Sequence, residues 1–330
     1  MRRRMAVRAT LAASGLGVAL AVAAFTVQHV QGQSTPWLGL ALPPPPEQLG
    51  RAHQALSQQL LGLIREDEWA AAANLAEAVS RSPVREPVLN YLLGVVHWQR
   101  GERIEAIQRL RTAETQGLRE SYLHQALGLA YYAANQFILF RQQMQLATAL
   151  DPHDPRPHFH LGRHAESVAG NSAAAMRHFE RALALDASDA RSQAWLALSL
   201  ERMDRREEAA ERYRLAARLA TARGERFSWP YRGLARLALG SAPSKAEEWA
   251  LLGVKAEPEV ADNHAILARA YERGGKLPLA AEAASEAVRL DPDNEVSHYL
   301  LYGVLRRLGR PDAADEHLRR FRALKRVYGD

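Results

Sequence analysis

The sequence contains no cysteine among its 330 residues. This absence excludes disulfide bonds, zinc–thiolate sites, iron–sulfur clusters, covalently attached haem and a cysteine nucleophile. Lysine is also scarce, because only four of the 43 basic residues are lysines and the others are arginines. A composition that is 47% hydrophobic and 24% charged excludes a disordered or fibrous chain and indicates a folded protein.

The N-terminal segment has no acidic residue before Glu47. Four arginines within the first eight residues precede an uncharged stretch, residues 9–27, in which Ala, Val, Leu and Gly dominate. Basic residues followed by an apolar stretch are typical of a secretory signal, and this stretch approaches the roughly 20 residues that span a bilayer as a helix. Residues 1–30 are therefore predicted to be a signal peptide or a transmembrane anchor. Either interpretation keeps the arginines in the cytoplasm and exports the remainder of the chain.

Residues 31–46 form a distinct segment that ends in four consecutive prolines. Consecutive prolines favour an extended helix without internal hydrogen bonds, so this segment is predicted to be a semi-rigid Pro-rich linker. The formal net charge of +6 belongs mainly to the N-terminus, because the other 39 basic and 37 acidic residues almost balance. A nearly neutral body argues against nucleic acid as a partner.

A sequence repeat with a period of 34 residues runs through the rest of the chain. Leu-Gly pairs begin at positions 93, 127 and 161, and Pro258 and Pro292 are separated by the same step. Within residues 261–294, one apolar helical face ends at Gly275 and a second face ends before Pro292. Small residues on both faces permit two antiparallel helices to approach closely. One such pair cannot bury its apolar faces alone, so the pattern predicts an all-α stack of helix pairs.

The period and the order of the Leu-Gly, Tyr, Gly, Ala, Phe, Ala and Pro positions resemble the tetratricopeptide repeat (TPR) family. The clearest copy, residues 121–154, departs from the family by having Asn135 in place of glycine and Phe140 in place of a small residue. The resemblance implies a right-handed TPR α-solenoid of about eight helix-turn-helix repeats over residues 47–330, preceded by one N-terminal hydrophobic helix in a bacterial protein. The predicted repeats lie near residues 52–86, 87–120, 121–154, 155–189, 190–223, 227–260, 261–294 and 295–328.

No catalytic motif accompanies the repeats. The sequence has no G-x-S-x-G elbow, no P-loop and no G-x-G-x-x-G after a strand, so neither an enzyme nor a cofactor is predicted. The densest histidine group consists of His153, His158, His160 and His164. The segment contains no H-E-x-x-H motif, and its two arginines would place positive charge beside a metal ion. We therefore interpret these residues as surface or groove histidines and predict no metal site.

The TPR resemblance implies that the first helix of each pair lines a concave groove, which holds an extended peptide or a partner helix. Large aromatic residues and arginines are the types enriched at interface hot spots. The resulting groove candidates are Tyr91, Trp98, Tyr122, Gln125, Tyr132, Arg156, Phe159, Arg163, Arg191, Trp195, Tyr231 and Arg232. Core packing is an alternative role for Trp98, Tyr132 and Trp195. The Lys and Asn set of chaperone-binding TPR proteins is not found, so that ligand is not predicted.

We therefore expect a non-enzymatic TPR scaffold that binds a protein partner, a subunit of an envelope complex, on the extracytoplasmic (periplasmic) side of the membrane. The N-terminal helix would anchor it in the inner membrane, or cleavage of the signal would release it. One alternative is an accessory subunit of an envelope enzyme system for glycan assembly or cytochrome maturation. Another is a periplasmic protein that binds metal through the histidine group.

Overall fold

The structure is a computed structural model that describes residues 51–80 and 84–328. Within these ranges the chain forms sixteen helices, α2 to α17, and no strand. The predicted signal or anchor over residues 1–30 and the predicted linker over residues 31–46 lie outside the described residues. No helix in the described part of the chain is long and apolar enough to cross a membrane.

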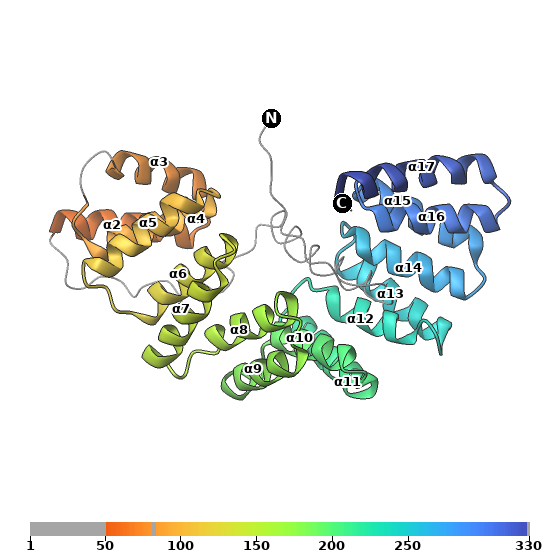
Figure 1. The fold of residues 1–330 in the computed structure, drawn as a ribbon, viewed down its shortest axis with the longest axis horizontal. Helices are drawn as coiled ribbons and strands as arrows, with labels where there is room; N and C mark the ends of the chain where they lie inside the picture. The colour runs from red at the N-terminus through yellow and green to blue at the C-terminus, as the bar shows by residue number, and fades with distance from the viewer. Residues whose placement is uncertain (1–50, 81–83, 329–330) are drawn as a thin grey trace. The chain divides into compact units, whose positions relative to one another are not determined.

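The helices follow one another as antiparallel pairs and belong to two compact units, α2–α7 and α8–α17, with the turn Ser167–Gly170 grouped with the first (Figure 1). The first unit contains the pairs α2 (Arg51–Arg65) and α3 (Trp69–Ser80), α4 (Pro87–Gln99) and α5 (Arg103–Thr115), and α6 (Ser121–Ala133) and α7 (Phe137–Leu150). The second unit contains α8 (Arg156–Ser167) and α9 (Ser172–Leu185), α10 (Ala190–Arg202) and α11 (Arg206–Ala222), α12 (Trp229–Ala238) and α13 (Pro243–Ala256), α14 (Ala261–Arg273) and α15 (Leu277–Leu290), and α16 (Glu295–Arg307) and α17 (Pro311–Tyr328). The repeat borders, the handedness and a single continuous solenoid stay predictions.

The turn between the two helices of a pair requires a residue with positive φ in most repeats. Gly275 has a φ of 75° and Gly309 a φ of 70° in this turn. Asn135 occupies the same position after α6 with a φ of 60°. Because asparagine adopts the left-handed conformation more readily than most residues with a Cβ, it can replace the glycine that the repeat pattern favours here.

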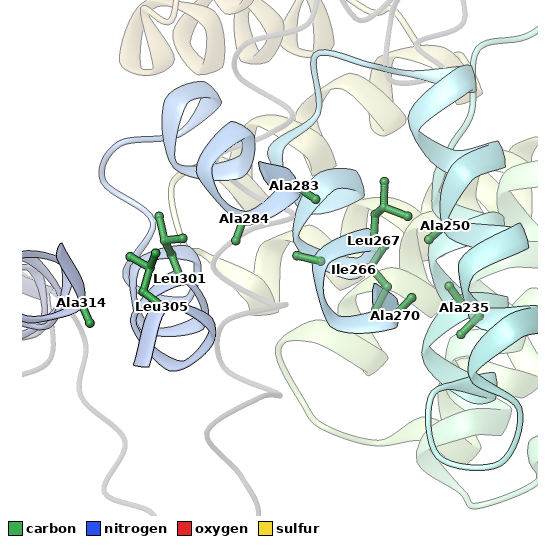
Figure 2. Packing of buried hydrophobic residues seen from close by; sticks show 12 residues of the cluster. Ala235, Ala250, Ile266, Leu267, Ala270, Ala283, Ala284, Leu301, Leu305 and Ala314 are labelled. Carbon is green, nitrogen blue, oxygen red and sulfur yellow. The ribbon is translucent and has the colours of Figure 1, made fainter. Parts of the chain in front are cut away.

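Small residues of the first helices face large side chains of second helices, which belong to the same pair at Gly128 and to the preceding pair at Gly233. A Cβ added at Gly128 would lie 2.7 Å from Met144 Cε, and one added at Gly233 would lie 2.5 Å from the ring of Tyr213. Ala268 is likewise fully buried, as the sequence-based expectation of close approach requires. In the second unit, alanines from successive helices continue this packing around leucines of α14 and α16, as Figure 2 shows.

A glycine-to-alanine change should therefore cost more where the facing side chain cannot move. We expect Gly233→Ala to lower the free energy of unfolding by about 1–3 kcal/mol, because Tyr213 is fully buried. Gly128→Ala should cost less, since the unbranched Met144 can adapt. Gly303 of α16 is the control, because an added Cβ there meets nothing within 4 Å. Urea denaturation measures all three variants, and equal losses would contradict the close-approach explanation.

A polar pair recurs between the two helices of a repeat, at a constant sequence separation in most cases. The pairs are Asn90–Arg109 at 3.2 Å, His124–Gln143 at 2.7 Å, Gln193–Arg212 at 3.3 Å and His298–His317 at 3.0 Å. Between α8 and α9, which carry one extra residue, His158 and His178 occupy this place with ring centroids 5.9 Å apart. These contacts join the partly buried polar edges of each helix pair.

The histidine pair between α8 and α9 makes stability depend on pH. Burial lowers the pKa of His158, and His178 and Arg181 lower it further. Burial also lowers the pKa of His178, with a smaller effect of Arg177. The folded chain therefore binds fewer protons than an unfolded chain whose histidines titrate near 6.5, so this contribution to stability is present above that pH and is lost below it.

We expect the free energy of unfolding to fall between about pH 7 and about pH 5 because protonation of this pair is disfavoured in the folded chain. His178→Gln should reduce that fall, because it removes one of the two titrating rings. Urea denaturation at both pH values measures the difference. His264→Gln, outside the pair, serves as the control. A pH dependence that His178→Gln leaves unchanged would contradict this explanation.

Candidate protein-binding surface

Five side chains meet on the second unit, and we name them the aromatic–arginine surface: Phe159, Arg163, Trp195, Phe227 and Trp229. The ring of Trp195 on α10 meets the ring of Trp229 edge to face at 4.8 Å. The guanidinium carbon of Arg163 on α8 lies 5.6 Å from the Trp195 ring centroid and 5.8 Å from that of Phe159. The ring of Phe227 lies 6.2 Å from that of Trp229. Three first helices thus contribute to one continuous cluster.

Burial divides this surface into a floor and an accessible part. Trp195 is only 5% exposed and stacks on the buried Phe179 at 6.0 Å, so it forms the floor. The other four side chains are half-buried and keep part of their area accessible. The two neighbouring rings hold Arg163 in place through cation–π contacts, which favour a cation over an aromatic face. The accessible part therefore combines apolar rings with a positioned guanidinium group.

The first helices α8, α10 and α12 carry an excess of positive charge. They contain six arginines and two glutamates. The side chains of the glutamates, Glu166 and Glu201, are only 0% and 17% exposed, whereas Arg191 is exposed and Arg163 is half-buried. The two acidic groups are thus turned inward, four of the six arginines pair with carboxylates, and the charge of Arg191 is exposed.

Both glutamates tie one first helix to the next. The Glu166 carboxylate accepts hydrogen bonds from Ser172 Oγ at 3.0 Å, from Ser199 Oγ and from Arg202 Nη1 at 2.6 Å. Such charge-assisted hydrogen bonds are stronger than neutral ones and fix the geometry of the groups they join. This network therefore holds α8 and α10 in one register beneath the aromatic–arginine surface.

Hydrogen bonds to Glu201 likewise hold α10 and α12 in one register. Arg236 donates to the Glu201 carboxylate from Nε at 2.7 Å and from Nη2 at 2.6 Å. The Tyr213 hydroxyl donates to it at 3.2 Å, and burial raises the pKa of that hydroxyl. Glu272 and Arg307 form the equivalent pair between α14 and α16 at 2.8 Å. The glutamate position is thus a recurring feature of the repeat.

The ion pair between Glu166 and Arg202 should contribute more to stability than the more exposed pair between Glu272 and Arg307. We expect Arg202→Met to lower the free energy of unfolding by about 3 kcal/mol or more, because it leaves the buried Glu166 carboxylate without its counter-charge. Arg307→Met should cost less than about 1 kcal/mol, since that pair is largely solvated. Urea denaturation compares the two variants. Similar losses, or no recovery when Glu166→Gln is added to Arg202→Met, would contradict the assignment.

Several predicted groove residues of the first unit lie in its core. Tyr91 is fully buried and meets Tyr122, which is 9% exposed, edge to face at 4.9 Å. Gln125 is 1% exposed, and its Nε2 donates to Ser121 Oγ at 3.0 Å. For Tyr91, Tyr122 and Gln125, packing is the role that the structure shows.

The two other candidates of the first unit keep some accessible area. Trp98 is half-buried near the end of α4. Tyr132 is also half-buried, and its ring lies 5.6 Å from that of Phe137 and 5.2 Å from that of Phe140. The large Phe140 thus occupies the position at which the repeat pattern favours a small residue. Contact of Trp98 and Tyr132 with a ligand stays a prediction.

The remaining candidates of the second unit are mostly engaged within the chain. Arg156 pairs with Asp154 at 2.7 Å, and Arg232 pairs with Asp262 at 3.1 Å. The ring of Tyr231 stacks on that of Trp249, with centroids 6.3 Å apart. The structure therefore brings Phe159, Arg163 and Trp195 together. The other contacts described above engage Arg156, Tyr231 and Arg232.

Sequence analysis missed Phe227 and Trp229. Both follow the three-residue insertion at residues 224–226, which shifts the register of the repeat. Aligning Leu234 and the buried Ala235 with the Leu-Gly pairs of the preceding first helices would have restored the register and placed Trp229 at the start of α12, with Phe227 just before it.

The histidine group of residues 153–164 does not form a multidentate metal site. His160 and His164 are 3% and 5% exposed, whereas His153 is exposed. Within residues 51–80 and 84–328, no group of three or more His, Asp or Glu side chains is arranged to hold a metal ion. The alternative of a metal-binding protein based on that group gains no support.

No protein-family model and no curated protein matches the sequence. Among solved structures, the APC/C hetero-tetramer Cut9-Hcn1 is similar with a TM-score of 0.63 and 14% identity over 87% of this chain and 52% of the matched chain. Yeast Tom70 is similar with a TM-score of 0.60 and 14% identity over 93% of this chain and 69% of that one. The C-terminal part of a TPR repeat-containing protein from Cytophaga hutchinsonii has a TM-score of 0.53 and 15% identity over 74% of this chain and 99% of that one.

These similarities show that the chain has the fold of tetratricopeptide-repeat proteins, and they confirm the resemblance inferred from the sequence repeat. This chain spans about half the length of the matched chain in the Cut9-Hcn1 structure.

Proposed function

We propose that the protein is a non-enzymatic scaffold whose aromatic–arginine surface binds an extended, acidic segment of a partner protein. The observation that carries this proposal is the joint presence of accessible aromatic rings on α8 and α12 with Arg163 of α8 and the exposed Arg191 of α10. Aromatic rings supply contact area, and arginine recognises carboxylates with paired, directional hydrogen bonds. Complementary charge also speeds the encounter and excludes basic partners.

The surface is prepared for such a ligand before binding. Arg163 already lies against two rings, so less conformational freedom is lost when it meets a carboxylate. The Glu166 and Glu201 networks hold the three first helices in register, which keeps the spacing between the aromatic side chains constant. An extended segment can then lie across the first helices and contact each in turn.

We further propose that this scaffold acts on the extracytoplasmic (periplasmic) side of the membrane, where residues 1–30 anchor it or direct its export. The support is the order of basic and apolar residues at the N-terminus, followed by the Pro-rich linker. The partner is then a subunit of an envelope complex. In situ crosslinking of membrane fractions followed by mass spectrometry tests this location together with N-terminal processing.

Binding to defined peptides tests the surface itself. Fluorescence anisotropy compares a labelled peptide that alternates Asp or Glu with aromatic residues against its Asn and Gln counterpart. We expect the acidic peptide alone to bind, and Arg163→Glu and Trp229→Ala each to weaken binding by at least about tenfold. Added salt should weaken binding as well, because it screens accessible charges.

Arg218→Glu is the matched control, since it makes the same charge change at an exposed position of the second helix α11. It should leave affinity nearly unchanged, and circular dichroism should show that all variants stay folded. Equal weakening by Arg218→Glu and Arg163→Glu would show general charge attraction instead of a defined site. Equal binding of the acidic and the neutral peptide would contradict the proposed partner chemistry.

A further inference from the structure

Two histidines meet in the last helix pair of the second unit. His298 of α16 and His317 of α17 place their Nδ1 atoms 3.0 Å apart, with the ring planes tilted by 36°. His298 is 5% exposed, and His317 is half-buried. This site is remote in sequence from the aromatic–arginine surface, and the inference below does not depend on the proposed function.

A backbone carbonyl fixes the protonation of the His298 ring. Its Nε2 lies 3.1 Å from the carbonyl oxygen of Pro292. Because a carbonyl oxygen only accepts hydrogen bonds, Nε2 carries the proton, and Nδ1 of the neutral ring presents a lone pair toward His317. Histidines that ligate metals characteristically donate their other ring N–H to such a carbonyl or to a carboxylate.

The two rings share one hydrogen bond, whose place a metal ion can take. Because His298 Nδ1 accepts, His317 Nδ1 donates in the 3.0 Å contact between the two rings. An ion that binds both Nδ1 atoms takes the place of this proton, and the neutral His317 ring then carries its proton on Nε2. Two nitrogens that each lie ~2.0–2.1 Å from one tetrahedral zinc ion are about 3.3–3.4 Å apart. The two Nδ1 atoms, 3.0 Å apart here, therefore need to separate only slightly to hold the ion.

A surface cavity of about 460 Å³ adjoins the two rings and leaves room for further ligands. Glu316, Arg319 and Arg320 are the charged residues that line it. Arg320 donates to Asp293 Oδ1 at 2.7 Å, so part of the positive charge beside the cavity is compensated. Water molecules from this cavity can complete the coordination of an ion held by two imidazoles.

We infer that His298 and His317 together bind one divalent transition-metal ion, Zn²⁺ or Cu²⁺, through their Nδ1 atoms. Imidazole nitrogen is a preferred ligand of both ions. The bound ion joins α16 to α17, so it stabilises the final helix pair in proportion to the free metal concentration. The site has two protein ligands, with water in the remaining positions.

The preceding repeat contains a natural control for this inference. His264 lies one repeat period before His298, and its Nε2 is 2.7 Å from the carbonyl oxygen of Pro258. Ala283 stands one period before His317, so the second imidazole is absent there. His264 therefore reproduces the histidine and its carbonyl without the paired ligand.

Calorimetric titration of the metal-depleted full chain with Zn²⁺ tests the site. We expect the native chain to bind one more equivalent than His317→Gln and His298→Gln, and the same number as His264→Gln. Zn²⁺ should also raise the melting temperature of the native chain more than that of His317→Gln. Because His317 is half-buried, His317→Gln is the decisive variant, and circular dichroism checks its fold.

Electron paramagnetic resonance of one equivalent of Cu²⁺ supplies an independent measurement. We expect hyperfine structure from two imidazole nitrogens in the native chain and in His264→Gln, with one of them lost in His317→Gln. The inference is overturned if the native chain binds no additional ion. It is also overturned if a folded His317→Gln chain binds Zn²⁺ and Cu²⁺ as the native chain does.

Discussion

The close approach of neighbouring helices at small residues is the constraint on which the rest of the structure depends. At Gly233 the absent side chain admits the ring of Tyr213, whose hydroxyl then reaches the carboxylate of Glu201. That carboxylate also receives both hydrogen bonds of Arg236 from the following first helix. The close contact of α12 with α11 and the polar contact of α12 with α10 therefore join the same two helix pairs at one place. A larger side chain at position 233 would therefore disturb both contacts.

Much of the fold could be predicted from the sequence because its determinants are local and recur at one period. The small residues, the turn and the proline after the second helix each lie at a fixed place in the repeat. Departures from the pattern needed the structure. Asn135 keeps the turn because it adopts the required positive φ, whereas the accommodation of Phe140 depends on the edge contact with Tyr132. A single repeat pattern contains no information on such compensation.

The candidate surface could be predicted only in part. Phe159, Arg163 and Trp195 were found because their helices keep the repeat register, and Trp229 was missed because an insertion shifts that register. Burial was harder to foresee, since the same aromatic and amide side chains serve in the core and at interfaces. Tyr91 shows this clearly: its position on a first helix suggested a groove, but its ring is enclosed by the first unit.

Net charge is a poor guide to the surface of this protein, because the buried glutamates redistribute it. Apart from the N-terminal arginines, acidic and basic residues almost balance over the whole sequence. Glu166 and Glu201 nevertheless place their charge inside the repeats, where each holds an arginine of the next first helix. Exposed arginines such as Arg191 are then not offset by acidic groups on α8, α10 or α12. The contacts that stabilise the stack therefore also create the local positive surface on which recognition of an acidic partner would depend.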